Sequence, residues 1–231
     1  MFEQLWIEGP TICEVAVEQP LVAQWEAKTN PAQIRLRDYL NKLVLSLTPL
    51  PAEGLLCLHY EICIADARHL LSGCDLENFL TPMFGKDGFP HNRFSLVSAR
   101  KSLGPSSSIR VGYAIGNSTS FDGWFGARVH AGSGSSNDIW KERIRDVLAV
   151  EAKPLGAGSV AVQIAFRCSP QRRNWTNLWK SSGDAMGPIL GVTRESGFNP
   201  CDDRIVDLRF HSLDDPTLKN DVHLGYWWRR V

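Results

Sequence analysis

Two pairs of acidic residues stand out in this sequence because of their spacing and their neighbours. Asp75 and Glu77 flank one residue and are followed by Asn78, whereas Asp202 and Asp203 are adjacent and lead into an apolar segment. Carboxylate oxygens from two or three separate elements can hold Mg²⁺, a hard ion that prefers about six oxygen ligands, against a phosphate. A nearby lysine can stabilise charge that develops on the phosphoryl oxygens. The residue types are therefore compatible with metal-dependent phosphoryl chemistry.

Each of these residues also has an ordinary structural interpretation. Asp75 could cap the helix that follows it, because aspartate is favoured at that position. Asp202-Asp203 could form a turn that opens a strand. Lys180 lies in a short predicted helix, where a lysine is commonly a solvated charge. Asp214-Asp215-Pro216 is typical of a hairpin turn.

Other catalytic chemistries find little support in the sequence. The six cysteines contain no C-x-x-C pair, the six histidines lack metal-binding spacing, and no GxSxG or P-loop motif occurs. Lys and Arg number 25, as do Asp and Glu, and this neutral balance argues mildly against a dedicated nucleic-acid binder. We expect a cytoplasmic protein without membrane contact, since we find neither a secretory signal nor an apolar run of about 20 residues.

The order of predicted elements in the first half recurs in the second half. Asn30-Pro31 and Asn137-Asp138 each open an amphipathic helix. An apolar strand follows each helix, a loop leading into a short helix comes third, and a β-hairpin comes fourth. The matched segments are Leu55 to Ile64 with Val160 to Cys168, Asp75 to Phe84 with Asn174 to Met186, and the hairpins His91 to Lys101 plus Ile109 to Ile115 with Asp202 to Ser212 plus Val222 to Trp228.

This self-similarity predicts a tandem duplication. We expect an α/β (or α+β) fold of two units, residues 1–116 and 117–231, related by a pseudo-twofold axis. Each unit is expected to contain a mixed β-sheet packed by one or two helices. Gly116 to Ser120 has the composition of a linker and marks the expected boundary.

The second half resembles the RusA-type Holliday junction resolvases. RRNWTNLWKSSGDAM followed by CDDRIVDLRF is similar to the family pattern, in which Asp-x-Asp-Asn-Leu leads a helix with a Lys and an Asp-Ala-Leu, and a later Asp-Asp opens a strand. The resemblance covers Val160 to Trp228 well and Leu55 to Ile115 more weakly, so the first unit is the divergent one. The family acts as a homodimer that cuts four-way DNA junctions with Mg²⁺ held by those aspartates. The chain therefore looks like such a dimer fused into one polypeptide.

Carried over residue by residue, the acidic set of the family is divided between the two halves. The first half keeps the leading acids, Asp75 and Glu77, but has His91 and Asn92 in place of the later Asp-Asp and Thr81 in place of the lysine. The second half keeps the lysine and the later acids but has neutral residues at the two leading positions. The retained residues there are Lys180, Asp184, Asp202 and Asp203, and the neutral ones are Asn174 and Thr176.

The resemblance implies catalytic roles for the residues kept from the pattern and magnesium binding by four of them. The implied catalytic residues are Asp75, Glu77, Lys180, Asp202 and Asp203, and the implied magnesium ligands are the four acids among them. Two interpretations of the divided set are open. Either the acids of both halves meet in one composite site, or both sites have decayed and the fold survives as a binding surface.

Three functions are consistent with the sequence. The first is a RusA-like, Mg²⁺-dependent endonuclease, or a descendant of one, that acts on branched or otherwise structured DNA. The second is a catalytically inactive subunit of the same fold that binds DNA or docks on a protein partner in a larger complex. The third is a metabolic enzyme or small-molecule binder. Basic residues around the second motif would contact DNA phosphates without reading sequence, namely Arg167, Arg172, Arg173, Lys180 and Arg204.

Overall fold

A computed structural model of the chain describes residues 4–17, 30–71, 75–85, 88–117, 121–133, 137–152, 154–193 and 199–231. Its helices are α1 (Pro31–Ser46), α2 (Leu76–Leu80), α3 (Asn137–Glu151), α4 (Trp179–Asp184) and α5 (Gly187–Leu190). Its strands are β1 (Leu5–Val17), β2 (Leu56–Ile64), β3 (Phe94–Leu103), β4 (Ser107–Asn117), β5 (Phe125–His130), β6 (Val160–Cys168), β7 (Ile205–Asp214) and β8 (Val222–Arg230). Short 3₁₀ turns are η1 (Ala67–His69), η2 (Thr81–Phe84), η3 (His91–Arg93), η4 (Trp175–Leu178), η5 (Asp202–Arg204) and η6 (Pro216–Leu218).

The two long helices form where the sequence predicts them. The Asn30 side chain accepts a hydrogen bond of 2.8 Å from the Ala32 amide at the start of α1, and Pro31 occupies the first helical position. Helix α3 buries Trp140, Ile144 and Leu148, which lie four residues apart on one face. None of the described helices is long and apolar enough to cross a membrane.

The strands of the described residues form a single mixed sheet in the order β1-β4-β2-β3-β7-β6-β8-β5. This confirms the predicted mixture of α and β structure, with one sheet running through both halves. The halves meet at β3 and β7, which pair antiparallel about Ser98 and Arg209. The predicted linker lies at the end of β4, where Gly116 and Asn117 belong to the strand and residues 118–120 fall outside the described ones.

Strand pairing in the first half corresponds to that in the second half. Strand β2 pairs parallel with β3 and antiparallel with β4, as β6 does with β7 and β8. A register shift falls between Leu56 and Cys57 in β2, and the same shift falls between Val160 and Ala161 in β6. Strands β1 and β5, which the sequence did not predict, extend the two outer edges by pairing with β4 and β8.

The prediction of two β-hairpins is wrong, although their strands exist. In the sheet β2 lies between β3 and β4, and β6 lies between β7 and β8. The short connections therefore cross the end of the intervening strand instead of closing a hairpin. The Gly104 amide donates to the Ile64 carbonyl (3.4 Å) in one half, and the Asp215 amide donates to the Cys168 carbonyl (2.9 Å) in the other. The Asp214-Asp215-Pro216 segment belongs to this crossing, so its interpretation as a hairpin turn is also wrong.

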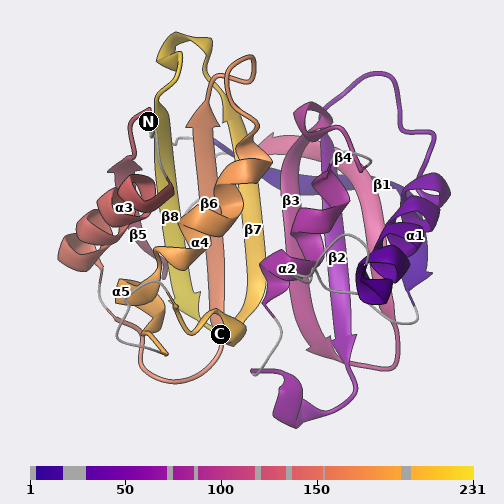
Figure 1. Cartoon of the computed structure of the whole chain (residues 1–231), viewed down its shortest axis with the longest axis horizontal. Helices are drawn as coiled ribbons and strands as arrows, with labels where there is room; N and C mark the ends of the chain where they lie inside the picture. Colours follow the sequence, from indigo (N-terminus) through magenta and orange to yellow (C-terminus); the bar gives the residue numbers. More distant parts are fainter. Residues whose placement is uncertain are drawn as a thin grey trace.

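The helices cover one face of the sheet, with α2 and α4 in front of the central strands, while β1 passes behind (Figure 1). One apolar core fills the helical side and includes buried residues from both halves. Phe84 of the first half packs edge-on against Trp179 of the second (5.4 Å between ring centroids), and Trp179 stacks on Phe210 of β7 (4.6 Å). The centre of the molecule is thus built by both halves together, which brings their motifs into contact.

Candidate active site

Asp75 stands at the start of α2 with its side chain available to a ligand. Its backbone has the extended conformation of a helix cap (φ −75°, ψ 121°), but its side chain makes no capping hydrogen bond. Instead, the Asn78 Nδ2 donates to the Asp75 Oδ2 at 3.1 Å. The structure thus confirms the position expected of a cap and assigns the carboxylate a different set of contacts.

Asp202 and Asp203 lie in η5, immediately before β7 begins. Because β3 and β7 are antiparallel, the start of β7 lies beside the end of β3. Lys101, near the end of β3, donates from Nζ to the Asp203 carbonyl at 2.7 Å and so ties these two ends together. The two aspartates are therefore held where β3 ends and β7 begins. We call this end of the two central strands the lower edge, after its place in Figure 1, and the opposite end the upper edge.

Helix α4 supplies the basic group of the site. The Lys180 Nζ lies 3.0 Å from the Asp184 Oδ1, one helical turn further on. The other oxygen of Asp184 lies 2.6 Å from the Nζ of Lys141, which comes from α3. Asp184 thus joins two helices, and Lys180 keeps a partly exposed ammonium group directed toward the sheet edge.

One cavity brings the acids of both halves together. It has a volume of about 270 Å³, and Asp75 of the first half lines it together with charged residues of the second half. The full lining is Asp75, Lys180, Asp184, Thr193, Asn199, Pro200, Asp202 and Asp203. Asp75 of the first motif thus lies beside the same cavity as Asp184, Asp202 and Asp203 of the second motif.

Glu77 does not line this cavity but is buried beside a second one. A second, smaller cavity of about 20 Å³ is shared by Glu77, Asp75 and Asp202 with buried apolar side chains, among them Ile164, Met186, Leu208 and Phe210. The Glu77 side chain is packed against α4, because a Cβ atom at Gly183 would stand only 2.9 Å from the Glu77 Oε2. The absence of a side chain at Gly183 is what gives this carboxylate its room.

The surroundings oppose full ionisation of the acids. Burial, together with the neighbouring Asp184, Asp202 and Asp75, raises the pKa of Glu77 to about 7 despite the nearby Lys180 ammonium. Burial and the Asp75 carboxyl raise the pKa of Asp202 well above its usual range. Burial works against the charge on Lys180, but Glu77 and Asp184 outweigh it, so the pKa of Lys180 is raised. Repulsion between neighbouring carboxyl groups thus contributes to the raised pKa values of Glu77 and Asp202.

Such a set of carboxylates fits a hard divalent cation in donor type. Mg²⁺ prefers carboxylate and water oxygens, and a cation would relieve the repulsion that raises these pKa values. Among the described residues, no group of three or more His, Cys, Asp or Glu side chains is arranged to hold a metal ion. Three of the four predicted magnesium ligands, Asp75, Asp202 and Asp203, line the larger cavity, whereas Glu77 lines only the smaller one.

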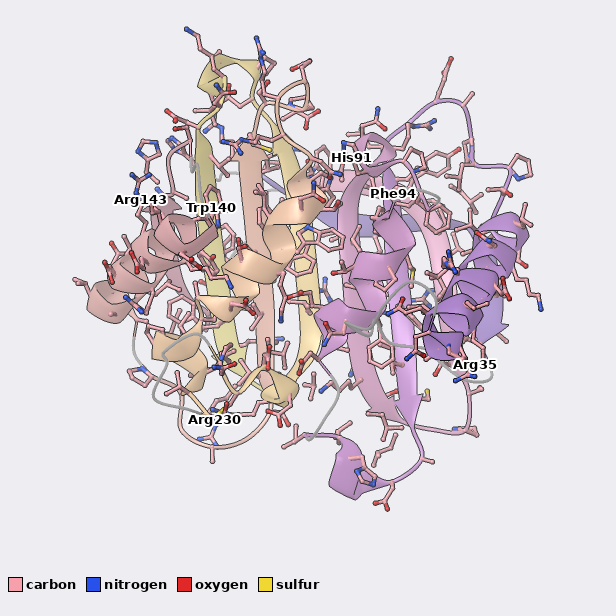
Figure 2. All side chains as sticks on the ribbon, viewed as in Figure 1. Arg35, His91, Phe94, Trp140, Arg143 and Arg230 are labelled. Atoms are coloured by element: carbon pink, nitrogen blue, oxygen red, sulfur yellow. The ribbon has the colours of Figure 1, made fainter. Side chains whose placement is uncertain are left out.

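The equivalent place at the opposite edge of the sheet has a different chemistry. His91 and Asn92 precede β3 there, as Asp202 and Asp203 precede β7, and Figure 2 shows His91 at the upper edge between the two halves. The Trp175 Nε1 donates to the His91 carbonyl at 3.0 Å, so the second motif meets the first here as well. The Asn174 Oδ1 accepts hydrogen bonds from the amide and hydroxyl of Thr176, at 3.0 and 2.7 Å.

The predicted DNA-contacting basic residues do not form one cluster. Arg204 lies at the start of β7 and donates to three backbone carbonyls, those of Gly158 (3.0 Å), Leu190 (2.7 Å) and Gly156. The other three arginines lie at or beyond the far end of β6. Arg167 pairs with Asp215 (2.7 Å), Arg173 donates to the Asn220 carbonyl, and Arg172 is exposed. Only Lys180 of this set lines the acidic cavity.

Several residues around the site were not predicted as part of it. Lys141 of α3 and Lys101 of β3 bind its residues, and Thr193, Asn199 and Pro200 line its cavity. No sequence pattern marks them, because their contribution depends on how α3 and β3 pack against the second motif. Comparison of the chain with protein-family models and with curated protein sequences found no match to either.

Proposed function

We propose that the chain is a tandem duplication of a RusA-like unit that acts as a Mg²⁺-dependent endonuclease on branched or structured DNA. In this proposal residues 1–116 and 117–231 form a fused pseudo-dimer with one composite catalytic site. The observation that carries the proposal is that Asp75 of the first half lines one cavity with Lys180, Asp202 and Asp203 of the second half, while Glu77 lines a smaller cavity that also includes Asp75 and Asp202.

The correspondence between the halves supports the duplication. Their pairings match strand for strand, including the register shift at the start of β2 and of β6. The match extends to single hydrogen bonds beside the strands. The Ala114 amide donates to the Leu55 carbonyl (2.8 Å) just before β2, and the Val231 amide donates to the Ser159 carbonyl (3.1 Å) just before β6. Independent origins would not be expected to reproduce a bulge and its flanking bonds at equivalent positions.

The chemistry of the site supports hydrolysis of a phosphodiester. A bound divalent ion would supply Lewis acidity toward the phosphate and its attacking water. Asp75, Asp202 and Asp203 would provide the oxygen donors, since they line the cavity. The Lys180 ammonium would lie beside the phosphate and stabilise negative charge on its oxygens. Lys141 would hold Asp184, and through it Lys180, in position.

Cleavage of a labelled four-way DNA junction tests the proposal. Wild-type protein should cut the junction with Mg²⁺ and stop when the ion is chelated, and Asp75→Asn and Asp202→Asn should each abolish cutting. Asp146→Asn is the matched control, because Asp146 is an exposed acid on α3 away from the cavity. Each variant should still bind the junction in low salt, where electrostatic contacts are strongest.

Wild-type protein that binds the junction without cutting it would contradict the endonuclease proposal and favour the inactive binding subunit. Absence of binding even in low salt would contradict both DNA-directed functions and leave a protein-docking subunit or a small-molecule function.

A further inference from the structure

The two edges of the central strand pair carry different numbers of acids. At the lower edge Asp75, Glu77, Asp202 and Asp203 gather around the acidic cavity. The equivalent residues at the upper edge are all neutral or weakly basic: Asn174, Thr176, His91 and Asn92. The acids of the two motifs are thus collected at one edge, whereas the cavity at the other edge is lined by one acid, Asp214, together with Arg173.

We propose that the chain cuts only one strand of its DNA substrate in each binding event and releases a nicked product. This inference rests on the proposed endonuclease function. A symmetric pair of sites would cut two strands, whereas this pseudo-dimer has the groups for a single incision. The upper edge would contact the second DNA strand without cutting it.

The size of the two cavities supports the asymmetry. The acidic cavity has a volume of about 270 Å³, whereas the cavity at the opposite edge, lined in part by His91, Asn92, Arg173 and Asp214, has about 20 Å³. About 20 Å³ is close to the space that one water molecule needs, so this cavity is much the smaller of the two. The Asn174 side-chain oxygen is also occupied, because it accepts two hydrogen bonds from Thr176.

The distance between the edges prevents one site from serving both strands without rebinding. Strand β3 has ten residues between them, which corresponds to roughly 30 Å at about 3.3 Å per residue. A second phosphodiester held at the upper edge would therefore stay out of reach of the acidic cavity at the lower edge. A second incision would require the DNA to dissociate and return in another orientation.

The incision itself is a hydrolysis that needs no further reactant than water. The water oxygen forms a new bond to phosphorus, and one of the two ester P–O bonds of that phosphodiester breaks. The proton lost by the water passes to solvent, and the departing ester oxygen takes up a proton to become a hydroxyl. The products are one strand ending in a phosphate monoester and one ending in a hydroxyl, with the partner strand intact.

A supercoiled plasmid that extrudes a four-way junction distinguishes one incision from two. One nick relaxes the plasmid to an open circle, whereas paired nicks across the junction convert it to a linear molecule. The reaction should contain fewer protein molecules than plasmids, and an excess of unlabelled junction added with Mg²⁺ should capture any protein that dissociates. Each plasmid is then acted on by one chain in one binding event.

We expect open circles to accumulate without linear DNA, and we expect Asp202→Asn to give neither product. Linear DNA formed by the wild-type protein under these conditions would overturn the single-incision inference while leaving the endonuclease function standing. Failure of the wild-type protein to form either product, with binding intact, would overturn the proposed function and the inference with it. A synthetic junction with each strand labelled separately should likewise show one strand cut per complex, and two strands cut per complex would overturn the inference.

Discussion

Asp75 and Asp202 line the same cavity although 127 positions separate them in the sequence (202 − 75). One belongs to the first half and the other to the second, and they meet because β3 and β7 pair antiparallel at the centre of the sheet. Two carboxylates beside one cavity repel each other, and the Asp75 carboxyl contributes to the raised pKa of Asp202. Their proximity is the feature on which the proposed metal-dependent chemistry depends.

Glu77→Gln should stabilise the protein at neutral and higher pH. Because the pKa of Glu77 is raised to about 7 in the folded state, the stability that it contributes is present below its ordinary value of 4.5 and is lost as the pH rises from there through about 7. The glutamine variant lacks this loss and should be more stable by about 1–3 kcal/mol near pH 8. Urea unfolding of both proteins at several pH values measures the difference. Equal pH dependence of the two proteins would contradict the assigned pKa.

Gly183→Ala should reduce activity far more than stability. The new Cβ would meet the Glu77 Oε2 at 2.9 Å, and the flexible end of that side chain can move aside. The free energy of unfolding should therefore change by less than about 1 kcal/mol, helped by the greater helix propensity of alanine. The displaced carboxylate should weaken divalent-ion binding and DNA cutting. Thermal unfolding and junction cleavage, measured side by side, check this expectation, and unchanged cleavage would show that the position of Glu77 is unimportant.

Arg204→Ala should lower stability, whereas Arg172→Ala should weaken DNA binding. Arg204 donates to three backbone carbonyls, so its removal should lower the free energy of unfolding by about 1–3 kcal/mol and leave the DNA affinity of the folded protein unchanged. Arg172 is exposed, so its removal should leave stability unchanged. In the proposed function it should weaken DNA binding and reduce the salt dependence of that binding, because a phosphate contact is lost. Denaturation midpoints and binding isotherms at two salt concentrations separate the two roles. Loss of DNA affinity in folded Arg204→Ala would contradict its assignment as a structural residue.

Glu8→Gln should weaken the attachment of β1 behind the sheet. The Glu8 carboxylate lies 3.3 Å from the His59 Nδ1 and 3.4 Å from the Arg110 Nη2. Its bond to His59 lowers the pKa of Glu8, so this contribution is present above pH 4.5 and is lost as the pH falls through the lowered pKa. The variant should lose about 1 kcal/mol near neutral pH, and the loss should vanish in acid. Urea midpoints at neutral and acidic pH measure this, and a loss that persists in acid would point to a packing effect.

The sequence predicts the individual elements of this fold better than their pairing. Helices α1 and α3 follow from caps and periodicity, and β2 and β6 follow from short apolar runs. The pairing of β3 and β4 was misjudged because proximity in sequence favours a hairpin, whereas here β2 separates them. Strand β1 was missed because its residues lack a clear alternation of apolar and polar types. The exposed and buried positions along it follow no simple period.

The residues of the site likewise divide into those that local sequence motifs reveal and those that only the packing of the fold reveals. The acids Asp75, Glu77, Asp202 and Asp203 are visible as motifs, and their division between the halves suggested a composite site. That they meet depends on the antiparallel contact of β3 with β7, which no local pattern determines. Lys141 enters the site only because α3 packs against α4 in this fold, so it could not be predicted from its neighbours in sequence.

Titration of the protein with Mn²⁺, a paramagnetic substitute for Mg²⁺, tests the composite site most directly. We expect one saturable ion site per chain in the wild-type protein and in Asp146→Asn. We also expect loss of that site in both Asp75→Asn and Asp202→Asn, which alter different halves of the molecule. Retention of the ion by either site variant, or a wild-type protein that binds no ion, would contradict a metal site built from both halves.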